Sequence, residues 1–245
     1  MNSPESPIFQ KSQVLYNVHL ARGAIRKNRK IVLFEGCMDV IAAGKAGIDN
    51  ALATMGTSLT SQHIRQMKRF AQEVVVCFDG DDAGWEAAKR AAVPLEEANF
   101  KVGIAVLPNG MDPDDYVRQN GADAFRENVI EKPQTFIAFA MMHARRHKNF
   151  QYENDLLQYI QEVLQLLAGK SSPVERDLYI KQLSAETKLS EEAILQQYRR
   201  LETRSIERSR PKAAESVQAA PKREQKKITS LHRAERLLFA QIFQW

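Results

Sequence analysis

Short apolar runs alternate with helix-like segments through residues 31–115, and three of the runs end at or near a carboxylate. These runs are 31–34, 73–78 and 101–107. Runs of this length, rich in Val, Ile and Phe and closed by Gly or Pro, are typical of strands buried on both faces. The pattern therefore predicts a β-α-β-α-β unit, which implies a parallel sheet with right-handed crossovers.

The acidic residues that follow the runs are the candidate chemistry. They are Glu35, Asp79, Asp81, Asp112 and Asp114. The carboxyl ends of parallel strands lie along one edge of the sheet, so we expect these side chains to converge there. Clustered carboxylates repel one another unless protons or cations compensate, and Mg²⁺ prefers such oxygen ligands. The sequence predicts an acidic, metal-dependent site for phosphate chemistry.

Weaker periodicities complete the α/β region. They predict helices at 12–27 with Ser12 as N-cap, at 38–46, after Thr60 or Ser61, at 82–99 and at 116–120, with a short strand at 50–54. Pro94 should kink or break the helix that contains it, because proline removes a hydrogen-bond donor. Gly121 should end the last of these helices.

From residue 122 onward no further strand is predicted, and apolar residues recur at helical spacing. We expect an N-terminal segment and helix at 1–29, a catalytic sheet domain at 30–121 and a helical bundle at 122–201. A polar, basic stretch at 202–227 is typical of a flexible linker. Residues 228–245 become amphipathic again and predict the start of another helical domain.

Composition narrows the function classes without selecting one. The chain has 245 residues, 44% of them hydrophobic, and a net charge of +5. The basic balance fits a nucleic-acid partner but does not establish it. Cys37 and Cys77 form no C-x-x-C pair, so we expect no zinc site in this chain and a reducing compartment. The absence of a signal peptide or a membrane-length apolar run predicts a cytoplasmic protein with no membrane partner.

Several short motifs, in order, carry a family resemblance. They are 2–11 (NSPESPIFQK), 35–40 (EGCMDV), 55–60 (MGTSLT), 79–84 (DGDDAG) and 112–115 (DPDD), with a helical stretch around 190–193. The acidic motifs resemble the TOPRIM domain of primases, topoisomerases and some nucleases. The whole set is similar to bacterial replicative DNA primases of the DnaG type, over nearly the whole chain. The N-terminal zinc-binding and basic parts of that family are not represented, and 228–245 would be the truncated start of its helicase-binding domain.

This resemblance implies polymerisation of ribonucleotides into RNA primers on a single-stranded DNA template by two-metal catalysis. The implied ligands of Mg²⁺ or Mn²⁺ are the five acidic residues above, of which Glu35, Asp79 and Asp81 are catalytic; Glu35 is a ligand or a general base. The implied substrate-binding residues are Lys11, Gly36 and Gly80. Asp39 and Asp82 are second choices, and Asp82 is expected rather to cap the helix at Ala83. The implied partners are template, nucleoside triphosphates, RNA primer and, through 228–245, the replicative helicase.

Three other interpretations compete with this one. Another TOPRIM enzyme is less favoured, because a topoisomerase needs a tyrosine nucleophile from a further domain and none is evident. A non-catalytic TOPRIM scaffold for replication partners would not need the carboxylates. A receiver-like phosphoacceptor domain would leave Asp112, Asp114 and the helical extension unexplained.

Overall fold

The computed structural model describes residues 10–108 and 110–209, without the side chains of 169–170 and 203–209. The chain divides into two units, Met1–Glu202 and Thr203–Trp245. The description below concerns the first unit and the helix that runs out of it.

A five-stranded sheet organises the described residues, with strand order β2-β1-β3-β4-β5. The strands are β1 (Lys30–Phe34), β2 (Ala51–Ala53), β3 (Glu73–Val76), β4 (Lys101–Ile104) and β5 (Gln134–Thr135). The first four are parallel, which confirms the predicted parallel sheet. The fifth pairs antiparallel with β4. It was not predicted, because a strand of two residues is too short to show a periodicity.

The register brings three strand ends together. Leu33 pairs with Val76, and Val76 pairs with Ile104. The chain therefore leaves β1, β3 and β4 at the same edge of the sheet, and the acidic residues follow within a few positions.

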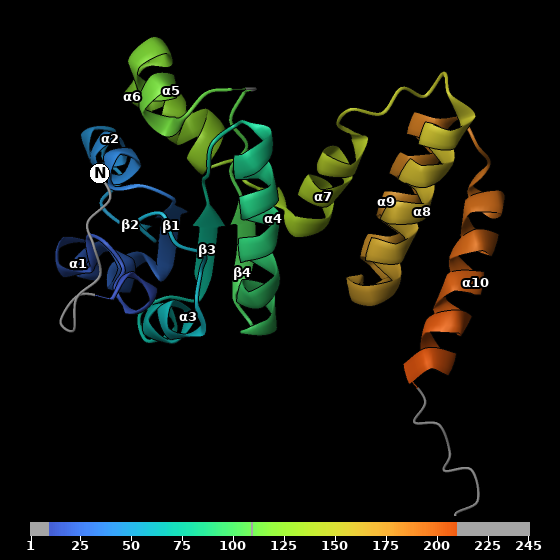
Figure 1. Cartoon of the computed structure of the whole chain (residues 1–245), viewed down its shortest axis with the longest axis horizontal. Helices are drawn as coiled ribbons and strands as arrows, with labels where there is room; N and C mark the ends of the chain where they lie inside the picture. Colours follow the sequence, from blue (N-terminus) through green and yellow to red (C-terminus); the bar gives the residue numbers. More distant parts are fainter. Residues whose placement is uncertain (1–9, 109, 210–245) are drawn as a thin grey trace, which may run out of the picture. The chain divides into compact units, whose positions relative to one another are not determined.

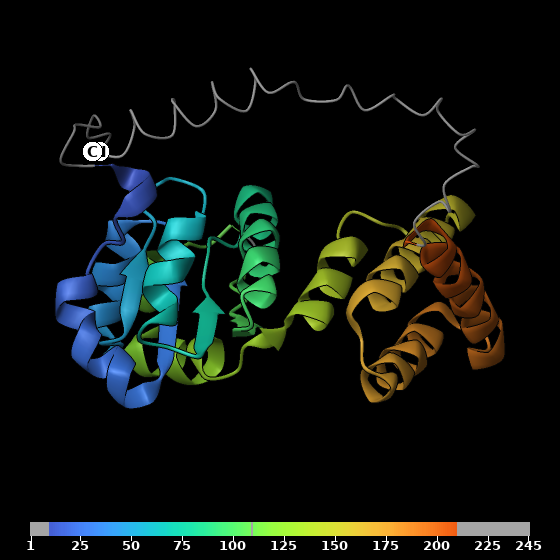
Figure 2. The same ribbon diagram turned by 90° about the horizontal axis from the view of Figure 1, so that it is seen from below.

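Helices cover both faces of the sheet (Figures 1 and 2). One face packs against α1 (Val18–Asn28), α3 (Ser61–Lys68) and α4 (Asp82–Glu97). The other packs against α2 (Cys37–Lys45), α5 (Pro113–Asn120), α6 (Ala122–Phe125) and the π-helix η2 (Arg126–Ile130). Neighbouring residues of β1 point to opposite faces, and both faces are buried, which explains the unbroken apolar run.

A helical region follows β5. It contains α7 (Phe136–Arg145), α8 (Glu153–Lys170), α9 (Pro173–Thr187) and α10 (Glu191–Ser209). Both views show α7 between the sheet and α8 (Figures 1 and 2). Phe136 and Phe139 of α7 belong to the core of the sheet, whereas Ile137 and Met141 belong to the helical core. This one helix is therefore shared by two hydrophobic cores.

The first helix begins later than its apolar spacing predicts. A 3₁₀ turn, η1 (Lys11–Gln13), comes first, and α1 starts only at Val18. Between them the backbone N–H of Tyr16 donates to Ala53 O at 2.9 Å, in an antiparallel bridge to β2. Asn17, not Ser12, precedes the helix, with a left-handed backbone and a side chain that donates to Ala51 O at 3.0 Å. A tertiary contact has thus overridden a local helical pattern.

Two other helix predictions need correction. Pro94 lies inside α4, which continues to Glu97 and buries Ala91, Ala92 and Leu95 around it, so proline does not end this helix. The helix predicted at 116–120 starts at Pro113, because Asp112 is its N-cap. The end at Gly121 and the cap at Thr60 are as predicted.

The region boundaries also differ in detail from the predicted division. Residues of α6 and η2 pack on the sheet, and β5 joins it, so the sheet core continues beyond Gly121. Helix α10 runs to Ser209, so the first part of the predicted linker, 202–209, is helical. The rest of that linker and the predicted helical start at 228–245 lie outside the described residues. No helix in the described ranges has both the length and the apolar character needed to cross a bilayer.

Candidate active site

Three loops at the carboxyl edge of the sheet supply the acidic side chains. Glu35 follows β1, Asp79 and Asp81 follow β3, and Asp112 precedes α5. Burial raises the pKa of Asp79, and the charges of Asp112 and Asp81 raise it further. Burial likewise raises the pKa of Glu35, and the charge of Asp79 adds to this rise. The predicted convergence from three strands is therefore what the fold produces.

Glu35 is the most perturbed of these groups. Its pKa is raised to about 7, first by burial and then by the charges of Asp79, Asp39 and Asp81, while Arg90 acts in the opposite direction. Its Oε1 atom is buried and has no hydrogen-bond partner among the described residues. A buried, unpaired carboxylate oxygen is costly, so this atom favours a proton or a cation.

Asp39, a second choice from the sequence, belongs to the same cluster. Burial raises its pKa to about 6, and Asp79, Asp112 and Asp114 contribute. Its Oδ2 atom accepts a hydrogen bond from Gly36 N at 2.9 Å, which opposes the rise. Asp39 therefore both fixes the start of α2 and adds charge to the acidic edge.

Asp81 and Asp112 are positioned by the helices that they begin. Asp81 Oδ1 accepts a hydrogen bond from Gly84 N at 2.7 Å, and Asp112 Oδ1 accepts one from Asp115 N at 2.7 Å. Each cap engages one of the two carboxylate oxygens and holds the other in a defined direction.

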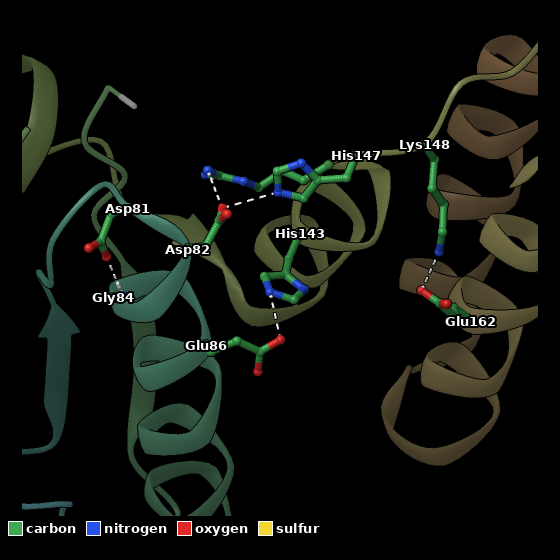
Figure 3. Close-up of polar contacts among 9 residues, drawn as sticks. Asp81, Asp82, Gly84, Glu86, His143, His147, Lys148 and Glu162 are labelled. Atoms are coloured by element: carbon green, nitrogen blue, oxygen red, sulfur yellow. Dashed lines mark hydrogen bonds and ion pairs between the residues drawn. The ribbon is translucent and has the colours of Figure 1, made fainter. Parts of the chain in front are cut away.

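Two of the candidate carboxylates have cationic partners. Asp114 accepts a hydrogen bond from Arg118 at 2.5 Å across one turn of α5, although its charge still reaches Asp39. Asp82 is bound to Arg146 at 2.7 Å. It also lies 3.1 Å from His147 (Figure 3). The cap of α4 is Asp81 and not Asp82, so the cap predicted at Asp82 is wrong by one residue.

The two candidate glycines permit close backbone contacts. A Cβ on Gly80 would lie 2.1 Å from Pro108 O, and Gly80 N donates to Met111 O at 2.8 Å. The loop after β4, which carries Asp112, can approach the loop after β3 only because Gly80 has no side chain. A Cβ on Gly36 would meet Asp39 Oδ2 at 3.1 Å, which is a tighter contact than most side chains make.

The structure places the candidate Lys11 in η1, and it shows a cation acting on Glu35, Arg90, that the sequence analysis did not single out. Lys11 lies in η1, where its carbonyl oxygen is 2.9 Å from His63 Nε2 of α3. The cation whose charge lowers the pKa of Glu35 is Arg90, on α4. Sequence reasoning missed Arg90, because a single arginine on an alanine-rich helix has the pattern of an ordinary surface residue.

A pocket of about 270 Å³ joins Glu35 to Arg90. It is lined by these two residues, by Phe78, by the α4 residues Ala87 and Ala91, and by Thr54, Gly56, Thr57, Ser58 and Leu59 of the β2–α3 loop. Consecutive left-handed residues, Met55 and Gly56, make this loop tight. A carboxylate, a guanidinium and several hydroxyls around one space form a chemically suitable site for a phosphorylated ligand.

The donor set fits a hard divalent cation. In the described part of the chain, no three His, Cys, Asp or Glu side chains are already arranged as a metal site. Mg²⁺ does not need such a cage, because it binds through one or two carboxylates and keeps other positions for water and phosphate oxygens. The unpaired Glu35 Oε1 and the raised pKa values of Glu35, Asp39 and Asp79 are consistent with a site that a cation completes.

One of the two cysteines, Cys77, lies in an environment that disfavours zinc binding. Cys37 and Cys77 are both free. Cys77 is fully buried, and burial raises the pKa of its thiol well above the ordinary value. Zinc is bound by the thiolate, which this environment disfavours.

Comparison with known families matches two segments of the chain. Residues 32–117 match the family described as Toprim-like. Residues 137–192 match the DnaB-helicase binding domain of primase. The second match covers α7, α8 and α9 and lies ahead of residues 228–245, where the sequence motifs placed the helicase contact.

Individual relatives agree with these matches. The chain is 44% identical to a DNA primase of Halalkalibacterium halodurans over 244 residues, which covers 98% of this chain and 41% of the relative. The chain spans about two fifths of the length of the curated relatives that it matches.

Solved structures show the same fold. The RNA polymerase domain of Mycobacterium tuberculosis primase DnaG, in complex with double-stranded DNA, superposes with a TM-score of 0.65 at 29% identity, covering 78% of this chain and 61% of that one. A DnaG primase catalytic domain bound to ssDNA gives a TM-score of 0.58 at 30% identity, covering 76% and 60%.

Proposed function

Because this chain belongs to the bacterial DNA primases, we propose that it is the catalytic core that joins ribonucleotides into short RNA primers on single-stranded DNA. The observation that carries the proposal is the meeting of Glu35, Asp79 and Asp112 from three strands beside the pocket that contains Arg90. This site lies within the segment that matches the Toprim-like family.

The reaction is a nucleotidyl transfer. The 3′-hydroxyl of the primer attacks the α-phosphorus of a nucleoside triphosphate, a new P–O bond forms, and the bond to the leaving pyrophosphate breaks. Bound Mg²⁺ or Mn²⁺ would supply the positive charge that stabilises the attacking and leaving oxygens. Asp79, Asp81 and Asp112 would hold the cations, with Asp114 as a further ligand when Arg118 releases it.

Glu35 and Arg90 have complementary roles in this proposal. A carboxyl with a pKa of about 7 is suited to accept the proton of the attacking hydroxyl, because a general base works best near the operating pH. Glu35 can instead coordinate the cation through its unpaired oxygen. Arg90, across the same pocket, would bind phosphate oxygens of the nucleoside triphosphate.

The proposed partners are the template, the nucleoside triphosphates, the RNA primer and the replicative helicase. A relative solved with ssDNA supports the template. The match of 137–192 to a helicase-binding domain supports the helicase. Alignment with DNA primases over 98% of the chain favours this function over a topoisomerase, a nuclease or a non-catalytic scaffold.

Primer synthesis on single-stranded DNA tests the proposal directly. The full primase that contains this chain, or this chain fused to the N-terminal parts of a relative, is supplied with labelled ribonucleotides and Mg²⁺. Glu35→Gln and Asp79→Asn should each lower primer yield by at least about 100-fold, because each removes charge from the site. Template affinity and circular dichroism should not change, since template binding depends mainly on Lys and Arg contacts to the backbone.

Asp123→Asn is the matched control. Asp123 is an exposed acid on α6 that pairs only with a neighbouring arginine on its own turn among the contacts of the described residues. It should leave primer yield unchanged. Wild-type rates in both Glu35→Gln and Asp79→Asn would contradict the polymerase assignment of this edge.

A further inference from the structure

The first turn of α4 carries two adjacent aspartates with different partners (Figure 3). Asp81 caps the helix through Gly84 N at 2.7 Å. Asp82 instead accepts a hydrogen bond from Arg146 Nη2 at 2.7 Å and lies 3.1 Å from His147 Nε2. Asp81, a carboxylate of the proposed catalytic edge, is therefore the direct sequence neighbour of Asp82, whose ion pair with Arg146 connects α4 to the end of α7.

Packing on both helices fixes the guanidinium of Arg146. Its Cζ atom lies 4.3 Å from the centroid of the Trp85 ring, and that ring stacks on Phe139 of α7 at 4.8 Å. Only 18% of the Arg146 side chain is exposed. Trp85 belongs to α4 and Phe139 to α7, so this stack holds Arg146 in a position that depends on how the two helices pack against each other.

The charge of Arg146 has one anionic partner in the described part of the chain, Asp82. The Nη1 atom of Arg146 is buried without a hydrogen-bond partner there. The Asp82 side chain is 66% exposed, so solvent screens this ion pair in part. The fixed position of the guanidinium therefore depends on the Asp82 contact together with the packing on Trp85.

A second contact in the same direction lies one turn further along α4. Glu86 Oε1 is 3.0 Å from His143 Nε2 (Figure 3). Asp82 and Glu86 are four residues apart on α4, so they share a face, and His143 and Arg146 are three apart at the end of α7. The two helices are thus joined by a row of polar contacts that ends beside Asp81.

We propose that Arg146 is a positioning residue for the catalytic edge: its ion pair with Asp82 fixes the first turn of α4 and, through it, the carboxylate of Asp81. The consequence for catalysis rests on the proposed function, whereas the positioning itself is a property of the metal-free fold. An N-cap carboxylate keeps its direction only while the amides of the first turn stay in place. Misplacement of a catalytic group by about 1 Å can cost about 100-fold in rate.

The first measurement follows the hydrogen bond between Asp81 and Gly84 N in protein that holds neither metal nor substrate. Amide hydrogen exchange of Gly84, observed by NMR, reports how often the bond to Asp81 opens. Arg146→Ala should accelerate this exchange about tenfold relative to amides later in α4, and Arg146→Lys should have an intermediate effect. Mn²⁺ affinity should fall about fivefold and kcat about tenfold, with KM for the nucleoside triphosphate within about twofold of wild type.

Lys148→Ala provides the matched control. Lys148 lies 2.8 Å from Glu162 of α8 and is as little exposed as Arg146, so its pair is comparable but does not include α4 (Figure 3). This variant should leave Gly84 exchange and Mn²⁺ affinity unchanged. Equal effects in Lys148→Ala and Arg146→Ala, or wild-type exchange in Arg146→Ala, would overturn the proposal.

Asp82→Asn guards against the chance that Arg146→Ala unfolds locally. It removes the charge and leaves the stack of Arg146 on Trp85 in place, so it must reproduce the Gly84 effect. The double variant Asp82→Asn, Arg146→Ala should add nothing to the larger single effect, and an additive result would contradict a shared role. If Gly84 responds as expected but the wild-type full primase, or the fusion that contains this chain, makes no primers, the proposed function fails and the positioning role stands.

Discussion

At the residue scale, the folded protein destabilises the ionised form of Glu35. Its pKa rises from 4.5 to about 7, mainly through burial. Below about pH 4.5 the group is protonated in both the folded and the unfolded chain, so it has no effect on stability. Between pH 4.5 and 7 the unfolded chain ionises first, so folding becomes less favourable as pH rises, and above pH 7 the full cost is present.

Replacement of Glu35 by glutamine should therefore stabilise the metal-free protein at pH 8 and not at pH 4.5. We expect a gain in the free energy of unfolding of about 1–2 kcal/mol, reduced from the full shift because the group is only half buried. Urea unfolding with chelator at both pH values measures it. The gain should shrink when Mg²⁺ is added, and a variant that is no more stable than wild type at pH 8 would contradict the assigned environment.

Arg90 should act on the nucleoside triphosphate. Arg90→Ala should raise KM for the triphosphate about tenfold, because one charge-assisted contact to phosphate is lost. Kinetics at saturating template measure this effect. Lys45→Ala, an exposed cation on α2, is the control and should leave KM unchanged. An unaltered KM in Arg90→Ala would remove this residue from the substrate pocket.

The residues that sequence reasoning found and missed differ in how they reach the site. The five acidic candidates follow apolar runs at short range, so their convergence could be predicted from strand direction alone. Arg90 reaches Glu35 from the middle of a helix, and Arg146 reaches Asp82 across 64 positions of sequence. Neither contact can be predicted from a local sequence pattern, because both arise only when whole helices and strands pack together.

At the scale of the elements, close approach of two loops decides where the carboxylates lie. The loop after β3 can contact the loop after β4 because Gly80 leaves room for Pro108 O. The parallel strands were predictable from their apolar runs. The two-residue strand β5 and the late start of α1 were not, because tertiary pairing with β4 and β2 decides both.

Gly80→Ala should therefore separate the two loops. We expect a loss of about 2–4 kcal/mol in the free energy of unfolding, because the new Cβ would lie 2.1 Å from a backbone oxygen. Mn²⁺ affinity should fall in the same variant. Calorimetry and metal titration are the measurements.

The control for this prediction is Gly44→Ala, within α2. A Cβ added at Gly44 would meet no atom of a neighbouring residue within 4 Å, so alanine fits without a clash. This variant should keep wild-type metal affinity and gain up to about 1 kcal/mol from helix propensity. Similar losses in both glycine variants would show that loop contact is not the reason for Gly80.

At the scale of the whole molecule, α7 links the sheet to the helical region. Phe139 is buried against Trp85 in the sheet core, while Met141 is buried in the helical core. A helix with two buried faces transmits unfolding of one core to the other. We therefore expect residues 10–202 to unfold in a single transition.

Phe139→Ala should weaken this link. We expect a loss of about 3–5 kcal/mol for the sheet and a separate, later transition for the helical core. Urea unfolding should then give two midpoints instead of one, followed by circular dichroism and by tryptophan fluorescence in a Trp245→Phe background, in which Trp85 alone reports. Leu183→Ala, in the helical core alone, should cost a similar amount without a shift of the Trp85 signal to lower urea. Coincident midpoints in Phe139→Ala would show that other contacts join the cores.

The shared helix also limits where relatives can exchange parts by recombination. A chimaera joined after residue 121, at the end of α5, would take α6, η2 and β5 from one parent and the sheet that they complete from another. A junction within 136–145 would divide one helix between two hydrophobic cores. A junction at 146–152, after α7 has ended, would keep the sheet core from a single ancestor, although the new parent would still have to match Ile137 and Met141. Inheritance of the acidic edge of the sheet is therefore tied to inheritance of α7.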